Sequence, residues 1–403
     1  MLRRLFLAGL LALLPTLGQA QDAGFNTLNG PAPFWVLRGQ GVAADLDFDF
    51  ANGRYYQKGI AVGLGVGNLL TTSRASTKYC NNTAGIWASV AANVLCVTNK
   101  GALIEEARTN DALWSRDMTN AAWVKVGMGT ALNAVGIDGT ANSATTLTAT
   151  GTASSCVASC TALQTITLGS SADTYSVWLK RVSGSGAVNI TINNLVGTTA
   201  CTLSSSVFTL CQVTATLANP VFGIQMAGLN DVIIADFNQT EPGVFATSPI
   251  LTTTVAVTRA ADASSVLYLP NFGTGISIFA SSSSGPNAPD VYGSSQVLVE
   301  ISNGSTNRVN LLRGTTGVVG PGGAGGTLST IQSWMNGIAP GTVEVSAPFR
   351  VASHVGSSGA VTLMTIGNRY DGTAQANMII SEVAVWPVTG LASAVLQRIT
   401  VTQ

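Results

Sequence analysis

The sequence predicts an all-β protein of antiparallel jelly-roll or β-sandwich modules in tandem, with little helix beyond a signal peptide and a short C-terminal turn. Gly, Ser, Thr, Ala, Val and Asn dominate the 403 residues, a composition that disfavours helices and suits short strands joined by tight turns. Large apolar and polar residues alternate in several runs, which places one face of each run in a core. Helical periodicity is scarce, and its best example after the N-terminus is the tail, 391–399.

Residues 1–20 have the order of a secretory signal peptide. Arg3 and Arg4 provide the positive start, residues 5–14 form an apolar run, and Pro15 precedes the small Ala20. The apolar run is short for a transmembrane span. A cleaved signal predicts an exported protein that is secreted, periplasmic or at the cell surface. An uncleaved membrane anchor is the alternative.

The cysteines and the charged residues further narrow the class of protein. The six cysteines form three local pairs along the chain, Cys80 with Cys96, Cys156 with Cys160, and Cys201 with Cys211. An even count in an exported chain predicts disulfides, although other connectivities stay open. A zinc site is the weaker alternative, because the chain has one histidine and no C-x-x-C. The 19 basic residues balance 19 acidic ones without a basic patch, which excludes nucleic acid as an expected partner.

Three segments follow the signal peptide. Residues 21–109 form an N-terminal β-rich segment, and residues 110–258 form a strand-rich block with four of the cysteines. Residues 259–403 form a third block without cysteine.

Period-two alternation predicts strands at 174–180 and 187–192 in the second segment, and at 296–301 and 378–386 in the third. The Gly-rich stretch 314–326 predicts a flexible turn or excursion. It has neither the signature of a phosphate-binding loop nor the triplet period of collagen.

Several strings resemble known modules. Those that resemble the opening of bacteriophage and prophage tail-fibre or head-spike-fibre-like proteins are 46–48, 53–55, 73–76, 92–94 and, most specifically, 103–110. Those that resemble a jelly-roll carbohydrate-binding module are 114–118, 122–123, 137–144, 239–243 and 246–250. Those that resemble a concanavalin-A-like or laminin-G-like lectin domain are 333–337, 365–369 and 380–386. The resemblance implies a jelly-roll domain at 110–258 and a lectin-like domain at 259–403.

Catalytic patterns are absent from the sequence. The acids of the third block are scattered singly, at Asp262, Asp290, Glu300, Glu344, Asp371 and Glu382, whereas glycoside hydrolysis needs paired carboxylates. Glu382 is expected to point outward into solvent. Glu105 and Glu106 are adjacent, so on a strand they face opposite sides. His354 stands alone, and no G-x-S-x-G elbow occurs, so no catalytic residue is predicted.

Sugar binding needs aromatic platforms flanked by side chains that bind hydroxyl groups. The predicted carbohydrate-binding residues are Trp114, Trp123, Trp334, Asn336, Arg369 and Tyr370. Trp123 is expected near a loop and exposed, whereas Trp178, in mid-strand, is expected in the core. By resemblance, Asp138 and Glu241 are candidate ligands of a structural Ca²⁺. The alternative is a turn-stabilising Asp and a capped Glu.

These observations predict a non-catalytic glycan-binding or adhesive protein, fibre-like or at an exported cell surface. Its expected partners are a surface polysaccharide or glycan, other fibre or envelope proteins, and further copies of the chain in a homo-oligomer. The alternative is a purely structural virion or envelope component without a ligand, which would place the protein in a virion. A glycanase is less favoured.

Overall fold

The computed structural model describes residues 44–62, 66–151, 156, 160–269, 275–283, 296–302, 308–313, 319–324, 328–335, 350–357, 362–369, 371–372, 375–387, 397 and 400. The predicted signal peptide, 1–20, lies outside these ranges. Within them the fold is all-β, as predicted, and the paired strands run antiparallel. Helical geometry in these ranges is confined to the 3-10 turn η1 (Val66–Asn68) and to Gln397 and Thr400 in the tail that the sequence predicts as helical.

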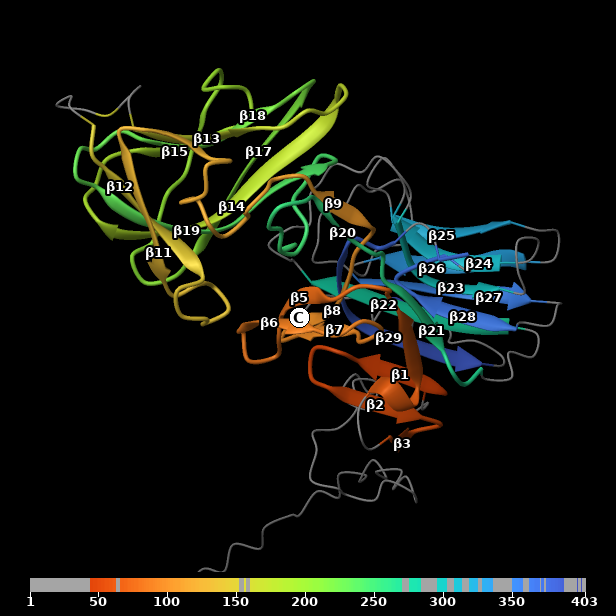
Figure 1. Cartoon of the computed structure of the whole chain (residues 1–403). Helices are drawn as coiled ribbons and strands as arrows, with labels where there is room; N and C mark the ends of the chain where they lie inside the picture. Colours follow the sequence, from red (N-terminus) through yellow and green to blue (C-terminus); the bar gives the residue numbers. More distant parts are fainter. Residues whose placement is uncertain are drawn as a thin grey trace, which may run out of the picture.

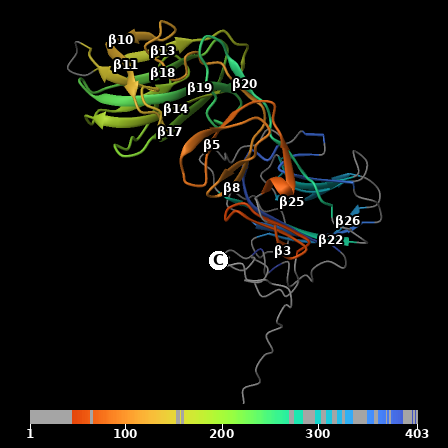
Figure 2. The same cartoon turned by 60° about the horizontal axis from the view of Figure 1, so that its bottom comes forward.

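The strands form two lobes that lie side by side (Figures 1 and 2). Lobe 1 combines the described residues of 44–110 with those from 257 onward, and lobe 2 comprises the described residues of 111–256. The three segments recognised in the sequence are therefore not three successive modules, because strands of the first and third share the same sheets.

Lobe 1 contains two sheets. Sheet I consists, in spatial order, of β26 (Leu328–Met335), β27 (Arg350–Ser357), β22 (Gly275–Ser283), β29 (Met378–Pro387), β1 (Leu46–Asp49), β2 (Arg54–Gln57) and β3 (Ile60–Ala61), with β8 (Gly101–Ile104) also on β29 and β7 (Cys96–Thr98) on β8. Sheet II consists of β25 (Val319–Ala324), β24 (Arg308–Arg313), β23 (Gln296–Ser302), β28 (Leu363–Ile366), β21 (Ala263–Val266) and β4 (Leu70–Ser73).

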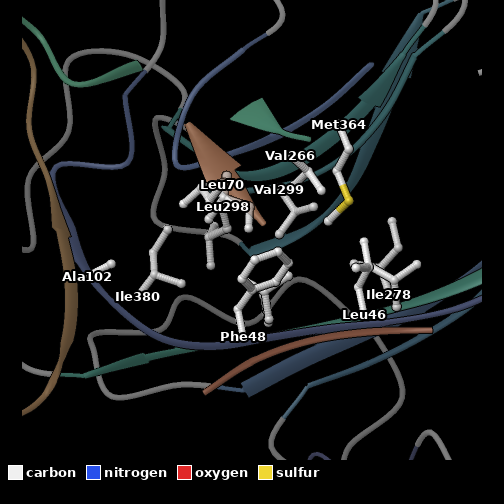
Figure 3. Close-up of a cluster of buried hydrophobic side chains, with 14 of the residues drawn as sticks. Leu46, Phe48, Leu70, Ala102, Val266, Ile278, Leu298, Val299, Met364 and Ile380 are labelled. Atoms are coloured by element: carbon white, nitrogen blue, oxygen red, sulfur yellow. The ribbon is translucent and has the colours of Figure 1, made fainter. Parts of the chain in front are cut away.

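The core of lobe 1 lies between these sheets (Figure 3). Leu46 and Phe48 of β1 alternate with acidic residues and are fully buried beside Ile278 of β22. Val299 and Met364 reach the same core from sheet II. Burial of each large apolar side chain contributes about 1.5–3 kcal/mol, so β1 is tied to the C-terminal strands chiefly by its apolar face.

Lobe 2 is a second sandwich. Sheet III consists of β10 (Val124–Val126), β13 (Thr161–Thr165), β18 (Val221–Met226), β15 (Val188–Thr191) and β16 (Thr199–Ala200). Sheet IV consists of β11 (Met128–Ala134), β12 (Ala144–Ala149), β19 (Val232–Pro242), β14 (Ser171–Ser183) and β17 (Thr209–Leu217). Trp123, Tyr175 and Phe222 meet in its core.

The predicted strands at 174–180, 187–192, 296–301 and 378–386 are confirmed as β14, β15, β23 and β29. The Gly-rich stretch 314–326 was predicted as a turn, and this is wrong for its central part, which forms β25 and pairs with β24. Backbone pairing does not require side chains, and β25 lies at the edge of sheet II, where Pro321 is tolerated although it has no N–H.

Short strands join the lobes. The chain enters lobe 2 through β9 (Arg108–Asn110) and leaves through β20 (Val257–Arg259), and these two strands pair with each other. The hairpin of β5 (Lys78–Asn81) and β6 (Trp87–Val90) projects from lobe 1 at the junction (Figures 1 and 2).

All six cysteines are paired in the local pattern that the sequence predicts. Cys80–Cys96 joins β5 to β7, with 5.7 Å between Cα atoms. Cys156–Cys160 closes a short loop before β13, and Cys201–Cys211 joins the edge of sheet III to the edge of sheet IV. Three disulfides indicate an oxidising or extracellular compartment. In the described ranges, no helix is long and apolar enough to cross a membrane.

Candidate functional site

Two tryptophans predicted to bind sugar lie in lobe 2. Trp123 is 1% exposed, packs edge-on against Phe222 with ring centres 5.7 Å apart, and donates its indole N–H to the Trp114 carbonyl at 3.3 Å. The prediction of an exposed Trp123 is therefore wrong, because the ring fills the core and its polar atom is satisfied there. Trp114 is half-buried, with a φ of +53°, and packs against the same core.

Most of the candidate residues from the third segment lie outside the part of the chain whose side chains the structure describes. Trp334 lies on β26 and its side chain is outside the described part, as are Asn336 and Tyr370. Arg369 is half-buried, and its carbonyl accepts hydrogen bonds from Asn368 and Gly372 at a turn. These residues stay predictions.

The two predicted calcium ligands do not fit a shared ion. Asp138 accepts both Arg116 Nη atoms at 2.8 and 2.9 Å, and its Oδ1 accepts the Thr140 N–H at 3.1 Å. Although burial opposes it, hydrogen bonds from Arg116 and Thr140 lower the pKa of Asp138. Within the described residues, no cluster of three or more His, Cys, Asp or Glu side chains could hold a metal ion.

Glu241, the second predicted ligand, accepts the N–H of Thr247 at 2.6 Å, its hydroxyl at 2.7 Å and the amide of Gln239 at 2.7 Å. Asp236 binds the same Arg116 as Asp138 does. The register partners of Glu241 and Asp236 on β14, Thr174 and Trp178, are four residues apart, which corresponds to about 13 Å. These contacts fit the alternative interpretation, in which Asp138 stabilises a turn and Glu241 is capped by its neighbours.

An aromatic seam of four side chains joins the hairpin β5–β6 to the outward face of sheet IV. Tyr79 of β5 meets Phe237 of β19 with ring centres 4.6 Å apart, and Trp87 of β6 meets Trp178 of β14 at 5.3 Å. Both contacts are edge-to-face, an arrangement that adds about 0.5–1.5 kcal/mol beyond area burial. The seam therefore fixes the hairpin on lobe 2.

Strand geometry explains how the seam reaches this face. Tyr175, Val177 and Leu179 point into the core, so Trp178 points outward and is half-buried, contrary to the prediction that it lies in the core. On β19 the register shifts opposite Val177, and Phe237 has a φ of +44°. Such a bulge re-aims side chains, which brings Phe237 to the seam.

Arg116 anchors one end of the seam. Its guanidinium lies 4.3 Å from the centre of the Phe237 ring and binds Asp236 through Nε at 2.7 Å, in addition to Asp138. Burial raises the pKa of Asp236, and Arg116 opposes that shift. The clamp holds the Phe237 side of the seam in place.

Two polar residues, Lys180 and Gln212, are neighbours of Trp178 in the strand register of the outward face. Lys180 follows Trp178 by two residues on β14, and its ammonium lies 5.1 Å from the centre of the Phe208 ring. On the neighbouring strand β17, Leu210 is the register partner of Trp178, and the exposed Gln212 lies two residues further along. A half-exposed indole beside an ammonium and an amide can stack on the apolar face of a sugar and bind its hydroxyl groups.

A buried ionic network supports the junction from lobe 1. Asp262 binds Arg74 at 2.7 Å and Lys78 at 2.6 Å, and Glu105 binds Lys78 at 2.9 Å and Arg259 at 2.8 Å. All five side chains are almost fully buried. The network joins the first segment to the strand that returns from lobe 2.

The string 103–110 also contacts lobe 2 directly. Glu105 accepts the Ser248 N–H at 2.8 Å and its hydroxyl at 2.7 Å. Asn110 donates to the carbonyls of Ile250 at 2.8 Å and Asn238 at 3.1 Å. The most specific string of the family resemblance therefore has a structural role at the lobe junction.

Sequence reasoning missed one group of acids. Asp47 and Asp49 of β1 lie on the outward face of sheet I, and Glu382 of β29 is the register partner of Asp49. Arg54 of β2 binds Asp49 at 2.6 Å. The alternation of Asp45, Asp47 and Asp49 along one strand was a visible signal, but the pairing with Glu382 spans most of the chain.

Comparisons with known proteins name no family. No family model and no curated protein matches the chain. Among solved structures, the chain is similar to the N-terminal CBM22-1–CBM22-2 tandem domain of Xyn10C from Paenibacillus barcinonensis, with 8% sequence identity and a TM-score of 0.25 over 72% of this chain and 98% of that chain.

Proposed function

We propose that the chain is an exported, non-catalytic glycan-binding protein of adhesive type, fibre-like or at a cell surface, and that it binds its ligand at the aromatic seam. The observation that carries the proposal is the half-exposed Trp178, held edge-on by Trp87 and flanked by Lys180 and Gln212. Its ring is immobilised before any ligand arrives, which lowers the entropy cost of binding. The disulfides support an exported location.

The acids on sheet I do not favour hydrolysis. Asp47 is fully buried, so it cannot reach a glycosidic oxygen in this structure. Asp49 is bound by Arg54 and Asn52, which leaves it poorly placed as a base. Release of reducing sugar from a polysaccharide by the purified chain would contradict the non-catalytic proposal.

Binding is tested by affinity electrophoresis of the full mature chain through gels that contain soluble polysaccharides, together with pull-down on insoluble cell-wall glycans. Trp178→Ala is expected to weaken retention about five- to thirty-fold, because an aromatic anchor contributes about 1–2 kcal/mol. Trp178→Phe should keep most of it. Trp114→Ala, which removes a half-buried indole of the same lobe outside the seam, is the matched control.

Retention that survives Trp178→Ala but is lost in Trp114→Ala would place the ligand elsewhere on lobe 2. The absence of retention on every glycan would favour the alternative of a purely structural component, in which the seam only joins the lobes.

A further inference from the structure

Strands β1 to β3 form the N-terminal edge of sheet I, residues Leu46–Ala61, and they join the rest of the sheet through β29. Leu46 pairs with Val385, Asp47 with Ala384, Phe48 with Val383, and Asp49 with Glu382. Beyond β1 the sheet continues only through β2 and the two-residue β3 in the described residues. The docking of this edge therefore depends on one strand pair, on the apolar face of β1, and on Phe50 and Tyr55, which enter the same core.

Asp47 is the polar residue at the centre of that strand pair. Its side chain is 0% exposed, and neither carboxylate oxygen has a hydrogen-bond partner among the described residues. An ionised carboxylate without a partner is poorly tolerated in such a place, whereas the neutral acid is tolerated much better.

The charged neighbours make the ionised form still less favourable. Asp49 faces Asp47 from the same strand and Glu382 faces it from β29, so both neighbours repel a negative charge. Arg54 of β2 is the facing cation, but Asp49 Oδ2 accepts both its Nε, at 2.9 Å, and its Nη2, at 2.6 Å. Burial, followed by Glu382 and Asp49, raises the pKa of Asp47 well above its usual value.

Two further titratable groups lie near this face. Tyr56 of β2 is the register partner of Asp47, and burial raises its pKa. Asp45 precedes β1 on the same face, is half-buried and has Lys58 nearby. Neither group supplies a positive charge to Asp47.

We propose that a proton on Asp47 holds the N-terminal edge against β29, and that loss of this proton as the pH rises loosens the edge while the rest of lobe 1 and lobe 2 stay folded. The device would make the accessibility of Leu46–Ala61 depend on the pH of the compartment that receives the exported chain.

The direction in which pH changes the docking of the edge follows from proton linkage. Below about pH 4 both the docked and the undocked edge carry the proton, so docking does not depend on pH there. Above that value the undocked edge loses the proton first, and the opening equilibrium constant rises about tenfold per pH unit until the docked form also ionises. Asp47→Asn mimics the protonated form at every pH and removes this dependence.

Hydrogen exchange measured by mass spectrometry tests the proposal on the full mature chain with its disulfides intact. After correction for the intrinsic rate, and under conditions where reclosing outpaces exchange, peptides that cover 45–61 should exchange about tenfold faster per pH unit above pH 4. Peptides that cover β14 should not. Asp47→Asn should remove the slope, and Asp45→Asn, the half-buried control on the same face, should keep most of it.

Glu382→Gln provides a second test that does not need the Asp47 variant to fold. It removes one repelling charge, so the slope should end at a lower pH than in the wild type. The proposal is overturned if Asp47→Asn keeps the wild-type slope, if β14 peptides show the same slope, or if Glu382→Gln leaves the end of the slope unchanged.

Discussion

Replacement of Glu105 by Gln tests the ionic network at the lobe junction most directly. Burial alone would raise the pKa of Glu105, but the charges of Arg259 and Lys78 and a hydrogen bond from Ser248 overcome it and lower the pKa from 4.5 to about 2. Lowering the pKa from 4.5 to about 2 corresponds to about 3 kcal/mol of folding free energy at neutral pH. Glu105→Gln also removes the carboxylate that binds Arg259 and leaves Lys78 with Asp262 as its remaining anion.

The direction of the pKa shift of Glu105 sets the pH range over which its contribution to stability is lost. Because the folded-state pKa is lowered, the contribution of Glu105 is complete above pH 4.5 and is lost as the pH falls from 4.5 towards 2. In wild type this group alone should reduce the free energy of unfolding by about 1.4 kcal/mol per pH unit in that window. In Glu105→Gln that contribution to the slope should disappear.

The assay is urea unfolding followed by tryptophan fluorescence at pH 7 and at steps between pH 5 and 2. Glu105→Gln should lose about 3–5 kcal/mol at pH 7, as expected when one partner of a buried ion pair is removed. Glu106→Gln is the matched control, because its side chain is 31% exposed and pairs with Arg108. It should lose less than about 1 kcal/mol. Equal losses in the two variants, or unequal losses with identical acid profiles, would refute the reasoning.

Three further predictions concern lobe 2. Trp123→Ala should lower the free energy of unfolding in urea by about 3–5 kcal/mol, because it leaves a cavity in the core. Trp178→Ala leaves no core cavity and should lower it by about 1 kcal/mol. Equal losses would contradict the positions assigned to the two side chains. Replacing Cys201 and Cys211 by Ser should lower it by about 2–3 kcal/mol under oxidising conditions, and the difference from wild type should vanish in reductant. Burial, followed by Asp173, raises the pKa of Asp111 to about 6, so stability falls as the pH rises from about 4 to 6. Asp111→Asn should therefore gain about 1 kcal/mol at pH 7, after allowance for solvent screening, and nothing at pH 3.5.

Local features of the fold were predictable from the sequence because they depend on neighbours along the chain. The alternation at 174–180 placed Tyr175 and Val177 in a core, and the short spacing of the cysteines suggested their pairing. The same alternation places Trp178 outward, against the general preference of tryptophan for burial.

Features that depend on distant pairing were not predictable. The pairing of β1 with β29 joins residues 46–49 to 382–385, and no pattern near either strand specifies the other. Phe237 reaches the seam through a bulge in β19, which the sequence does not mark with glycine or proline. The sequence alone therefore does not connect the carboxylates of Asp47 and Glu382, and it does not bring the four side chains of the aromatic seam together.

The insertion of lobe 2 between β9 and β20 has a consequence for the order of folding. Lobe 2 is continuous in sequence and can fold as soon as its residues emerge during synthesis or export. Lobe 1 cannot, because β1 pairs locally only with β2 and must wait for β29, its partner on the other side, more than 300 residues later. During that interval Leu46, Phe48 and the other apolar residues of the first segment have no core to enter, which exposes the chain to aggregation. A chain cut short before β29 should therefore retain a folded lobe 2 and an unfolded first segment.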